Sequence, residues 1–159
     1  MKRIALAAVA LSLLCSFAPG RADAGVTDGL GAWEGAGTTR DAAGGPSADF
    51  SVAVVRRALG PSRARTDAKI TLRDGRILDF WQEIQDVGAG AFRVTSANGS
   101  GSGQCFHNQM CQSYEERADG HAFATTIALD SPDKIRILVT ELEKGRAVRF
   151  IEQTLTKKP

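Results

Sequence analysis

The amino-acid sequence predicts an all-β protein, a single antiparallel up-and-down β-barrel of about 8–10 strands that follows a signal peptide. Short runs of residues alternate between apolar and polar side chains, which is the period of two expected for half-buried strands. Clusters of Gly, Asp, Asn, Ser and Pro separate these runs, and helical periodicity is sparse. Barrel closure is favoured because it removes the exposed strand edges that promote aggregation.

The N-terminal segment 1–24 is typical of a secretory signal peptide. Lys2 and Arg3 give it a positive start, the apolar run Ile4–Phe17 follows, and an Ala-Asp-Ala cleavage signal ends it. The apolar run is shorter than the roughly 20 residues that a membrane-spanning helix needs. We therefore expect a mature chain of residues 25–159, forming one domain, in the periplasm or outside the cell.

Cleavage changes the charge and the cysteine content. The chain has 20 Lys and Arg against 18 Asp and Glu, and three of the basic and one of the acidic residues lie in segment 1–24. The mature chain is therefore formally neutral, which gives no reason to expect a nucleic-acid partner. No later segment is long and apolar enough to span a membrane. Cys15 leaves with the signal peptide, so two cysteines remain in an oxidising compartment.

Two strands are predicted at the start of the mature chain, Trp33–Thr39 and Phe50–Arg57, on either side of the Gly- and Pro-rich loop Asp41–Ser47. A helix is the alternative for Phe50–Leu59, because its apolar residues also fit a period near 3.6. The clearest hairpin follows, where Asp74-Gly75 signals a two-residue type I′ turn. The strands it joins are Ala68–Arg73 and Arg76–Ile84.

The second half of the chain predicts the remaining strands. Asn98–Gly103, with the sequence NGSGSG, is interpreted as a mobile loop. Asp119-Gly120 signals a tight turn, and Lys144-Gly145 joins the last hairpin. The predicted strands are Ala91–Ala97, Gln104–His107, Gln112–Arg117, Phe123–Leu129, Lys134–Glu143 and Arg146–Thr156.

The stretch Gly31–Gly37, GAWEGAG, resembles the opening of lipocalin and nitrobindin-like barrels within the calycin group. The resemblance implies that Trp33 closes one end of a barrel and that the glycines let the first strand bend. It covers only these residues and the general strand meander. Haem binders of the nitrobindin type place their proximal histidine in the C-terminal part of the chain, whereas 122–159 contains no histidine. The resemblance therefore does not bring a haem site with it, and we expect no cofactor; non-covalent haem held by His107 or His121 is the alternative.

Cys105 and Cys111 are the first and last residues of the stretch CFHNQMC. Together with His107 and Met110, which lie between them, they offer ligands that suit copper(I). A zinc site would need further ligands that the sequence lacks, and a redox motif would have the spacing C-x-x-C. Five intervening residues suit a hairpin loop. The oxidising compartment that an exported protein enters converts such a cysteine pair to a disulfide. We predict a Cys105–Cys111 disulfide and no metal site.

The histidines, carboxylates and arginines give no specific signal of a catalytic centre. His107 and His121 are expected in or beside turns, and Glu141 and Glu143 on a solvent face. Glu115 and Glu116 are adjacent, so in a strand they point to opposite faces and cannot act as a pair. A basic cluster is expected to be solvated, with an anionic ligand as the alternative. Its members are Arg56, Arg57, Arg63 and Arg65.

The leading functional hypothesis is an exported, non-enzymatic barrel that binds a small apolar or amphipathic ligand, since a small barrel holds one ligand or fills itself with side chains. The alternative is a filled barrel that acts as an envelope, interaction or inhibitor-type protein. No nucleophile and base are recognisable as a pair, so no catalytic residue is predicted. The candidate pocket residues are Trp33, Phe80, Phe92, Phe123, Ile137 and Phe150.

Overall fold

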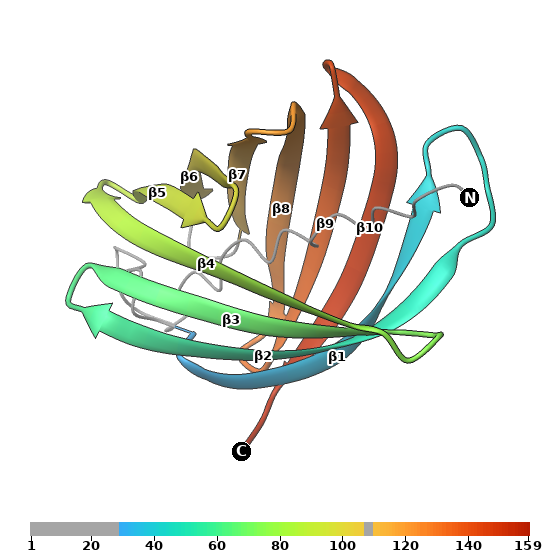
Figure 1. Cartoon of the computed structure of the whole chain (residues 1–159). Helices are drawn as coiled ribbons and strands as arrows, with labels where there is room; N and C mark the ends of the chain where they lie inside the picture. Colours follow the sequence, from blue (N-terminus) through green and yellow to red (C-terminus); the bar gives the residue numbers. More distant parts are fainter. Residues whose placement is uncertain (1–28, 107–109) are drawn as a thin grey trace.

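The computed structural model describes residues 29–106 and 110–159, which form a closed antiparallel barrel of ten strands (Figure 1). Each strand pairs with its neighbours along the chain, and β1 also pairs with β10. The all-β up-and-down prediction is therefore confirmed. The predicted signal peptide and His107 lie outside the described residues. The strands are β1 (Gly31–Asp41), β2 (Ala48–Gly60), β3 (Arg63–Leu72), β4 (Ile77–Gly88), β5 (Ala91–Ser96), β6 (Gly99–Phe106), β7 (Met110–Arg117), β8 (His121–Ser131), β9 (Lys134–Glu143) and β10 (Arg146–Lys157).

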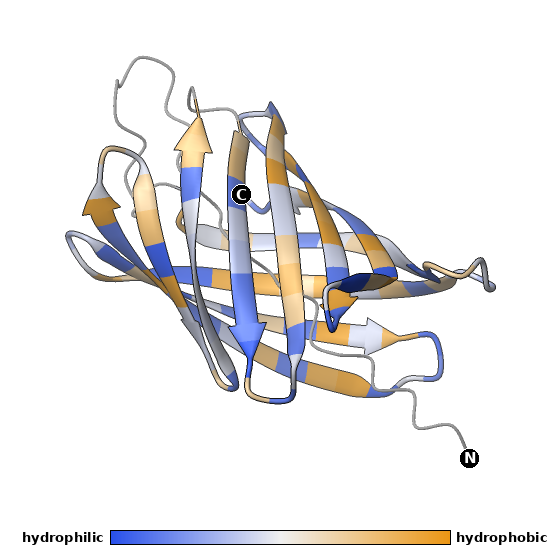
Figure 2. Cartoon of the chain, turned by 90° about the horizontal axis from the view of Figure 1, so that it is seen from above, coloured by the Kyte–Doolittle hydropathy of each residue, from blue (hydrophilic) through white to orange (hydrophobic). Residues whose placement is uncertain are grey.

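Buried and exposed residues alternate along β2 and β3, as the period of two predicts. Figure 2 shows the corresponding alternation of hydrophobic and hydrophilic residues along the strands. The helical alternative for Phe50–Leu59 is wrong, because β2 runs through the whole segment with Phe50, Val52 and Val54 buried. Aromatic residues from four more strands, among them Trp33 and Phe123, complete one continuous apolar core. No helix that could span a bilayer occurs in the part of the chain that the structure describes.

The hairpin turns differ in type from one another. Lys144 and Gly145 both have positive φ, 51° and 76°, as a two-residue type I′ turn requires. At the Asp74-Gly75 turn only Gly75 does, and its N–H donates to the Leu72 carbonyl oxygen at 2.9 Å. The prediction of a type I′ turn there is wrong, since Leu72 and Arg76 enclose a three-residue loop.

Asp74 explains that difference. Its carboxylate accepts a hydrogen bond from the backbone N–H of Arg76 at 3.1 Å. This hydrogen bond from a residue two positions on stabilises the three-residue loop. This backbone hydrogen bond, together with the Arg76 side chain, holds the pKa of Asp74 below its usual value. Because the pKa is lowered, ionised Asp74 stabilises the folded state at pH values above its ordinary pKa. This stabilisation is lost as the pH falls through the lowered pKa.

The Gly-Ser stretch is a strand and not the mobile loop that the sequence predicts. In β6, Gly99, Gly101 and Gly103 face inward and alternate with outward serines. A Cβ atom on Gly101 would collide with the backbone carbonyl oxygen of Tyr114, and one on Gly103 would collide with the ring of Phe92. The glycines are therefore required by the close approach of β7 and by the aromatic side chain that fills the space beside β6.

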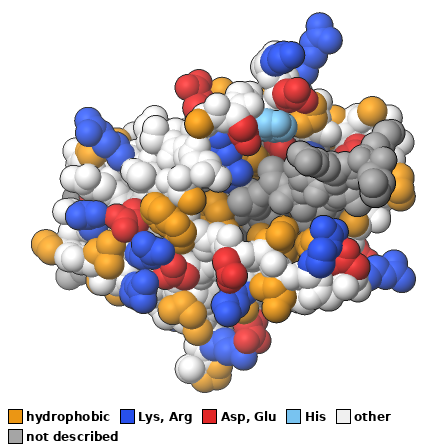
Figure 3. Space-filling model, viewed as in Figure 1, with side chains coloured by type: hydrophobic (Ala, Val, Ile, Leu, Met, Phe, Trp, Pro, Cys, Tyr) orange, Lys and Arg blue, Asp and Glu red, His pale blue; other side chains and the backbone are white. Residues whose placement is uncertain are grey.

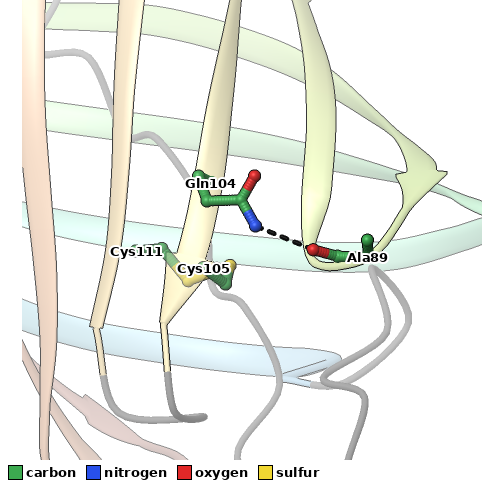
Figure 4. Close-up of a disulfide and its surroundings, with 4 residues drawn as sticks. All are labelled: Ala89, Gln104, Cys105 and Cys111. Carbon is green, nitrogen blue, oxygen red and sulfur yellow. Dashed lines mark hydrogen bonds between the residues drawn. A yellow bond between two sulfur atoms is a disulfide. The ribbon is translucent and has the colours of Figure 1, made fainter.

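The predicted disulfide is confirmed. Cys105 and Cys111 are directly opposite each other on β6 and β7, with their Cα atoms 4.0 Å apart (Figure 4). Beside them, the Gln104 side-chain amide donates to the Ala89 carbonyl oxygen at 2.7 Å, and the Cys105 N–H donates to that of Gly90 at 2.9 Å. The crosslinked hairpin is thereby tied to the turn between β4 and β5.

The inward position predicted for Phe150 is wrong. The pairing of β9 with β10 changes register between Ala147 and Arg149. After this irregularity Ile151 and Leu155 face inward, and Phe150 lies on the outside with 40% of its surface exposed. A bulge adds one residue to a strand and so reverses which of its later side chains point inward.

Replacing Gly101 by Val should destabilise the protein by roughly 1–3 kcal/mol, because the new side chain meets backbone atoms that cannot give way. Urea unfolding followed by tryptophan fluorescence measures the loss. Ser102→Val, on the outer face of the same strand, is the matched control and should leave the free energy of unfolding almost unchanged. Equal stabilities of the two variants would contradict the assignment of β6.

Replacing both Cys105 and Cys111 by Ser should lower the free energy of unfolding by about 2.4 kcal/mol, the chain-entropy value for a loop of this length. Urea unfolding of the mature protein, with and without a reducing agent, provides the measurement. Reduction should shift the wild-type midpoint and leave that of the double variant unchanged. A wild-type midpoint that is insensitive to reduction would argue against the crosslink.

Candidate functional site

Five of the six predicted pocket residues lie on the inner surface of the barrel. Trp33, Phe80, Phe92, Phe123 and Ile137 are all buried. The indole N–H of Trp33 donates to the Gly29 carbonyl oxygen at 3.1 Å, at the end of the barrel where β1 begins. The role of these five residues in ligand binding stays a prediction.

A row of polar side chains crosses the inner surface of β2 to β5. Arg56, Thr66, Gln82 and Ser96 are directly opposite one another on successive strands, and all four are buried. The prediction of a solvated basic cluster is wrong for Arg56, of which 2% is exposed. The other three arginines lie in surface ion pairs: Arg57 and Arg65 with Asp67, and Arg63 with Glu83.

Glu115 on β7 extends this row and is itself buried. Its two oxygens accept hydrogen bonds from the Gln82 amide at 3.0 Å and from the Ser96 hydroxyl at 2.6 Å. The Nε atom of Arg117 lies 3.7 Å from the same carboxylate, and its guanidinium stacks over the Phe123 ring at 4.3 Å. Glu115 therefore has neutral donors and a cation within reach, which a buried carboxylate needs.

A second charged group continues from β8 to β10. Glu141 is buried between Arg149, whose Nη1 donates to it at 2.9 Å, and His121, whose Nδ1 lies 2.9 Å from it. The contact with His121 is an ion pair when the imidazole is protonated. Arg149 also lies 3.9 Å from Asp41. The predicted solvent-facing position of Glu141 is wrong, because its side chain is buried. His121 begins β8 directly after the Asp119-Gly120 turn, and 27% of its side chain is exposed.

Strand register joins the two groups. Glu115, Phe123, Glu141 and Arg149 are opposite one another on β7, β8, β9 and β10. A polar arc therefore runs along the inner surface from β2 to β10, interrupted by the Phe123 ring. We name this set of residues the polar arc: Arg56, Thr66, Gln82, Ser96, Glu115, Arg117, His121, Glu141 and Arg149.

Several buried polar atoms on the inner surface have no hydrogen-bond partner among the residues that the structure describes. They are the Thr66 hydroxyl, the Gln82 carbonyl oxygen, the Ser113 hydroxyl and both polar atoms of the Gln153 amide. Buried polar groups in folded proteins are nearly always paired with protein atoms, water or a ligand. These atoms are therefore suited to hydrogen-bonding a molecule inside the barrel.

Strand alternation in the sequence indicates that these charged residues are buried. In β9, Glu141 continues the inward series of Ile135, Ile137 and Val139, and in β2 Arg56 continues the series that ends with Val54. A charged residue on the apolar phase of a strand is evidence of a polar interior, because alternation fixes the face whatever the side chain. Charge alone had suggested a surface position.

The outer wall has its own depressions. One of them, of about 730 Å³, lies over β6 to β9, and none of the described residues that line it is charged. Phe106, Tyr114 and Leu138 contribute exposed apolar surface to it. On the face shown in Figure 3, hydrophobic side chains are interspersed with charges of both signs. Within residues 29–106 and 110–159, no three or more His, Cys, Asp or Glu side chains gather as a metal site would require.

Comparison with known proteins finds similarity in structure only. No protein family and no curated protein sequence matches the chain. The S-type phycobiliprotein lyase CPES from Guillardia theta superposes with a TM-score of 0.69 at 9% identity, over 82% of this chain and 89% of the lyase. Rv2717c from M. tuberculosis gives a TM-score of 0.64 at 14% identity, over 82% and 92%. The fold is thus a closed antiparallel barrel that resembles the calycin-type barrels.

Replacing Arg149 by Met should destabilise the protein at pH 7 by roughly 3–5 kcal/mol, because the buried Glu141 carboxylate loses its hydrogen-bonded cation. Adding Glu141→Gln to this variant should restore much of the loss, since the uncompensated charge is then removed. Urea unfolding of the two single variants and the double variant gives the coupling free energy. Strictly additive effects would show that the two side chains do not interact.

Proposed function

We propose that this protein binds one small amphipathic molecule inside the barrel, with its apolar part on the aromatic and aliphatic core and its polar groups on the inner surface. The observation that carries the proposal is the set of unpartnered polar atoms of Thr66, Gln82, Ser113 and Gln153 inside a closed barrel. Leaving such groups unpaired costs stability, and a bound molecule would recover that cost.

The size of the barrel supports room for a ligand. Eight strands enclose a space that side chains just fill or that holds one small ligand, and the width grows with strand number. This barrel has ten strands, and β3 contributes small inward residues, Ala64 and Ala68.

The structural neighbours support the proposal in a limited way. One of them is named as a phycobiliprotein lyase, so a barrel of this form occurs in a protein that acts on phycobiliproteins. At such low identity the similarity concerns the fold alone. A nitrobindin-like relationship is part of the proposal, and it is supported by the position of Gly31–Gly37 in β1.

Export and the absence of catalysis are also part of the proposal. The Cys105–Cys111 disulfide suits an oxidising compartment such as the periplasm or the extracellular space. Glu115 and Glu141 are each engaged by neighbouring donors or cations, an arrangement that suits structural or binding roles.

The second candidate function is an interaction protein with a filled barrel. The uncharged outer depression over β6 to β9, with Phe106, Tyr114 and Leu138 exposed, favours it. In that case the outer wall would contact an envelope protein and the interior would hold no ligand.

Replacing the inward Ala68 by Phe separates the two candidates. In a hollow barrel the variant stays folded, and its affinity for the apolar dye Nile red falls about tenfold or more because the ring occupies the ligand space. Fluorescence titration measures this affinity, and urea unfolding measures stability. Ala53→Phe, on the outer face of β2, is the control and should bind as the wild type does.

The opposite outcome is equally clear. A wild-type protein that takes up no dye and carries no additional mass in native mass spectrometry, with an Ala68→Phe variant destabilised by roughly 1–3 kcal/mol, would establish a filled barrel and contradict the binding proposal.

A further inference from the structure

Gln153 is a buried polar side chain on the inner surface. It lies on β10 with 1% of its surface exposed, between the buried residues Ile151 and Leu155. Directly opposite it are Ile137 on β9 and Gly37 on β1. It is not among the contacts that join the polar arc.

Within residues 29–106 and 110–159, neither the Nε2 nor the Oε1 atom of Gln153 has a hydrogen-bond partner. Gln82 provides the contrast, because its Nε2 donates to Glu115 and only its Oε1 is unpartnered. Gly37 contributes no side chain, and Ile137 contributes only carbon. A complete amide is therefore held against apolar surface, an arrangement that costs stability unless something pairs with it.

The chemistry of an amide defines its complement. A primary amide presents an acceptor oxygen and N–H donors side by side in one plane. A carboxylate would accept from Nε2 but leave Oε1 facing negative charge, and an ammonium group would leave Nε2 unpaired. A lactam, or another amide in the cis form, offers a carbonyl oxygen and an N–H in the same plane and pairs with both atoms at once.

We infer that Gln153 recognises a lactam or cis-amide edge of an otherwise apolar ligand, with the lactam carbonyl oxygen accepting from Nε2 and the lactam N–H donating to Oε1. This inference rests on the proposed function, since it requires a ligand in the barrel. It adds the polar group that the ligand carries and the residue that selects it.

Two fluorescent probes of nearly equal shape test the inference. 2-Quinolinone carries the lactam N–H, and N-methyl-2-quinolinone lacks it. The mature, oxidised protein should bind the first about tenfold to a hundredfold more tightly, because the second leaves the Gln153 oxygen unpaired in an apolar site. Fluorescence titration at pH 7 gives both dissociation constants.

Gln153→Leu should abolish this preference by weakening the binding of 2-quinolinone while leaving that of its N-methyl analogue unchanged or tighter. The variant should also unfold at a higher temperature than the wild type without ligand, because an unpaired buried amide has been removed. Gln85→Leu, at an exposed position of β4, is the matched control and should keep the wild-type preference.

The outcomes distinguish the inference from the proposed function. Uptake of Nile red combined with equal affinity for the two quinolinones, or with a preference that survives Gln153→Leu, overturns the role of Gln153 and leaves ligand binding intact. That result would mean that water or the protein itself satisfies the amide. Failure to take up any of the three probes overturns both.

Discussion

The pairing of β1 with β10 is the constraint on which the rest of the structure depends. It runs from Trp33 opposite Lys157 to Asp41 opposite Arg149. One further backbone hydrogen bond extends it at each end, from Ala42 N–H to the Val148 carbonyl oxygen and from Lys158 N–H to that of Ala32. The pairing needs glycine, because a Cβ atom on Gly35 would collide with the carbonyl oxygen of Thr154. Closure by these two strands leaves the sheet without an edge and separates an inner surface from solvent.

Separation from solvent makes the inner polar groups consequential. In water, Glu115 and Glu141 would be ordinary surface carboxylates. Inside the barrel each must be matched by donors, and the structure supplies Gln82 and Ser96 to the first and Arg149 to the second. The amide of Gln153 has no such match. The two kinds of polar group therefore have different roles. The paired carboxylates link neighbouring strands, and the unpartnered neutral groups suit a ligand.

Local pattern was sufficient to predict most of the fold. Alternation and turn residues predicted the strands, and spacing and compartment predicted the disulfide, because these depend on neighbours along the chain. Two features could not be predicted in this way. The β6 glycines are explained only by the approach of Tyr114 and Phe92 from other strands. Phe150 faces outward because of a bulge beside Ala147 that no turn residue signals.

The polar interior differs from these two features, because strand alternation does indicate it. Arg56 and Glu141 occupy the inward phase of their strands, whereas their charge predicts a solvated position. The partners of the buried Glu141 lie on other strands, which the pattern within one strand does not specify. Thus the sequence predicts the candidate apolar wall of the site better than the groups that could select a ligand.

Methyl NMR of the mature, oxidised protein, titrated with Nile red, tests most directly whether the ligand site is inside the barrel. The inward reporters are Ile127, Ile137 and Leu155, and the outward ones are Val55, Ile77 and Leu138. Interior binding predicts that the inward methyl resonances shift in proportion to bound dye while the outward ones stay in place. Shifts confined to Leu138 and its outer neighbours would place the site on the outer wall and contradict this account.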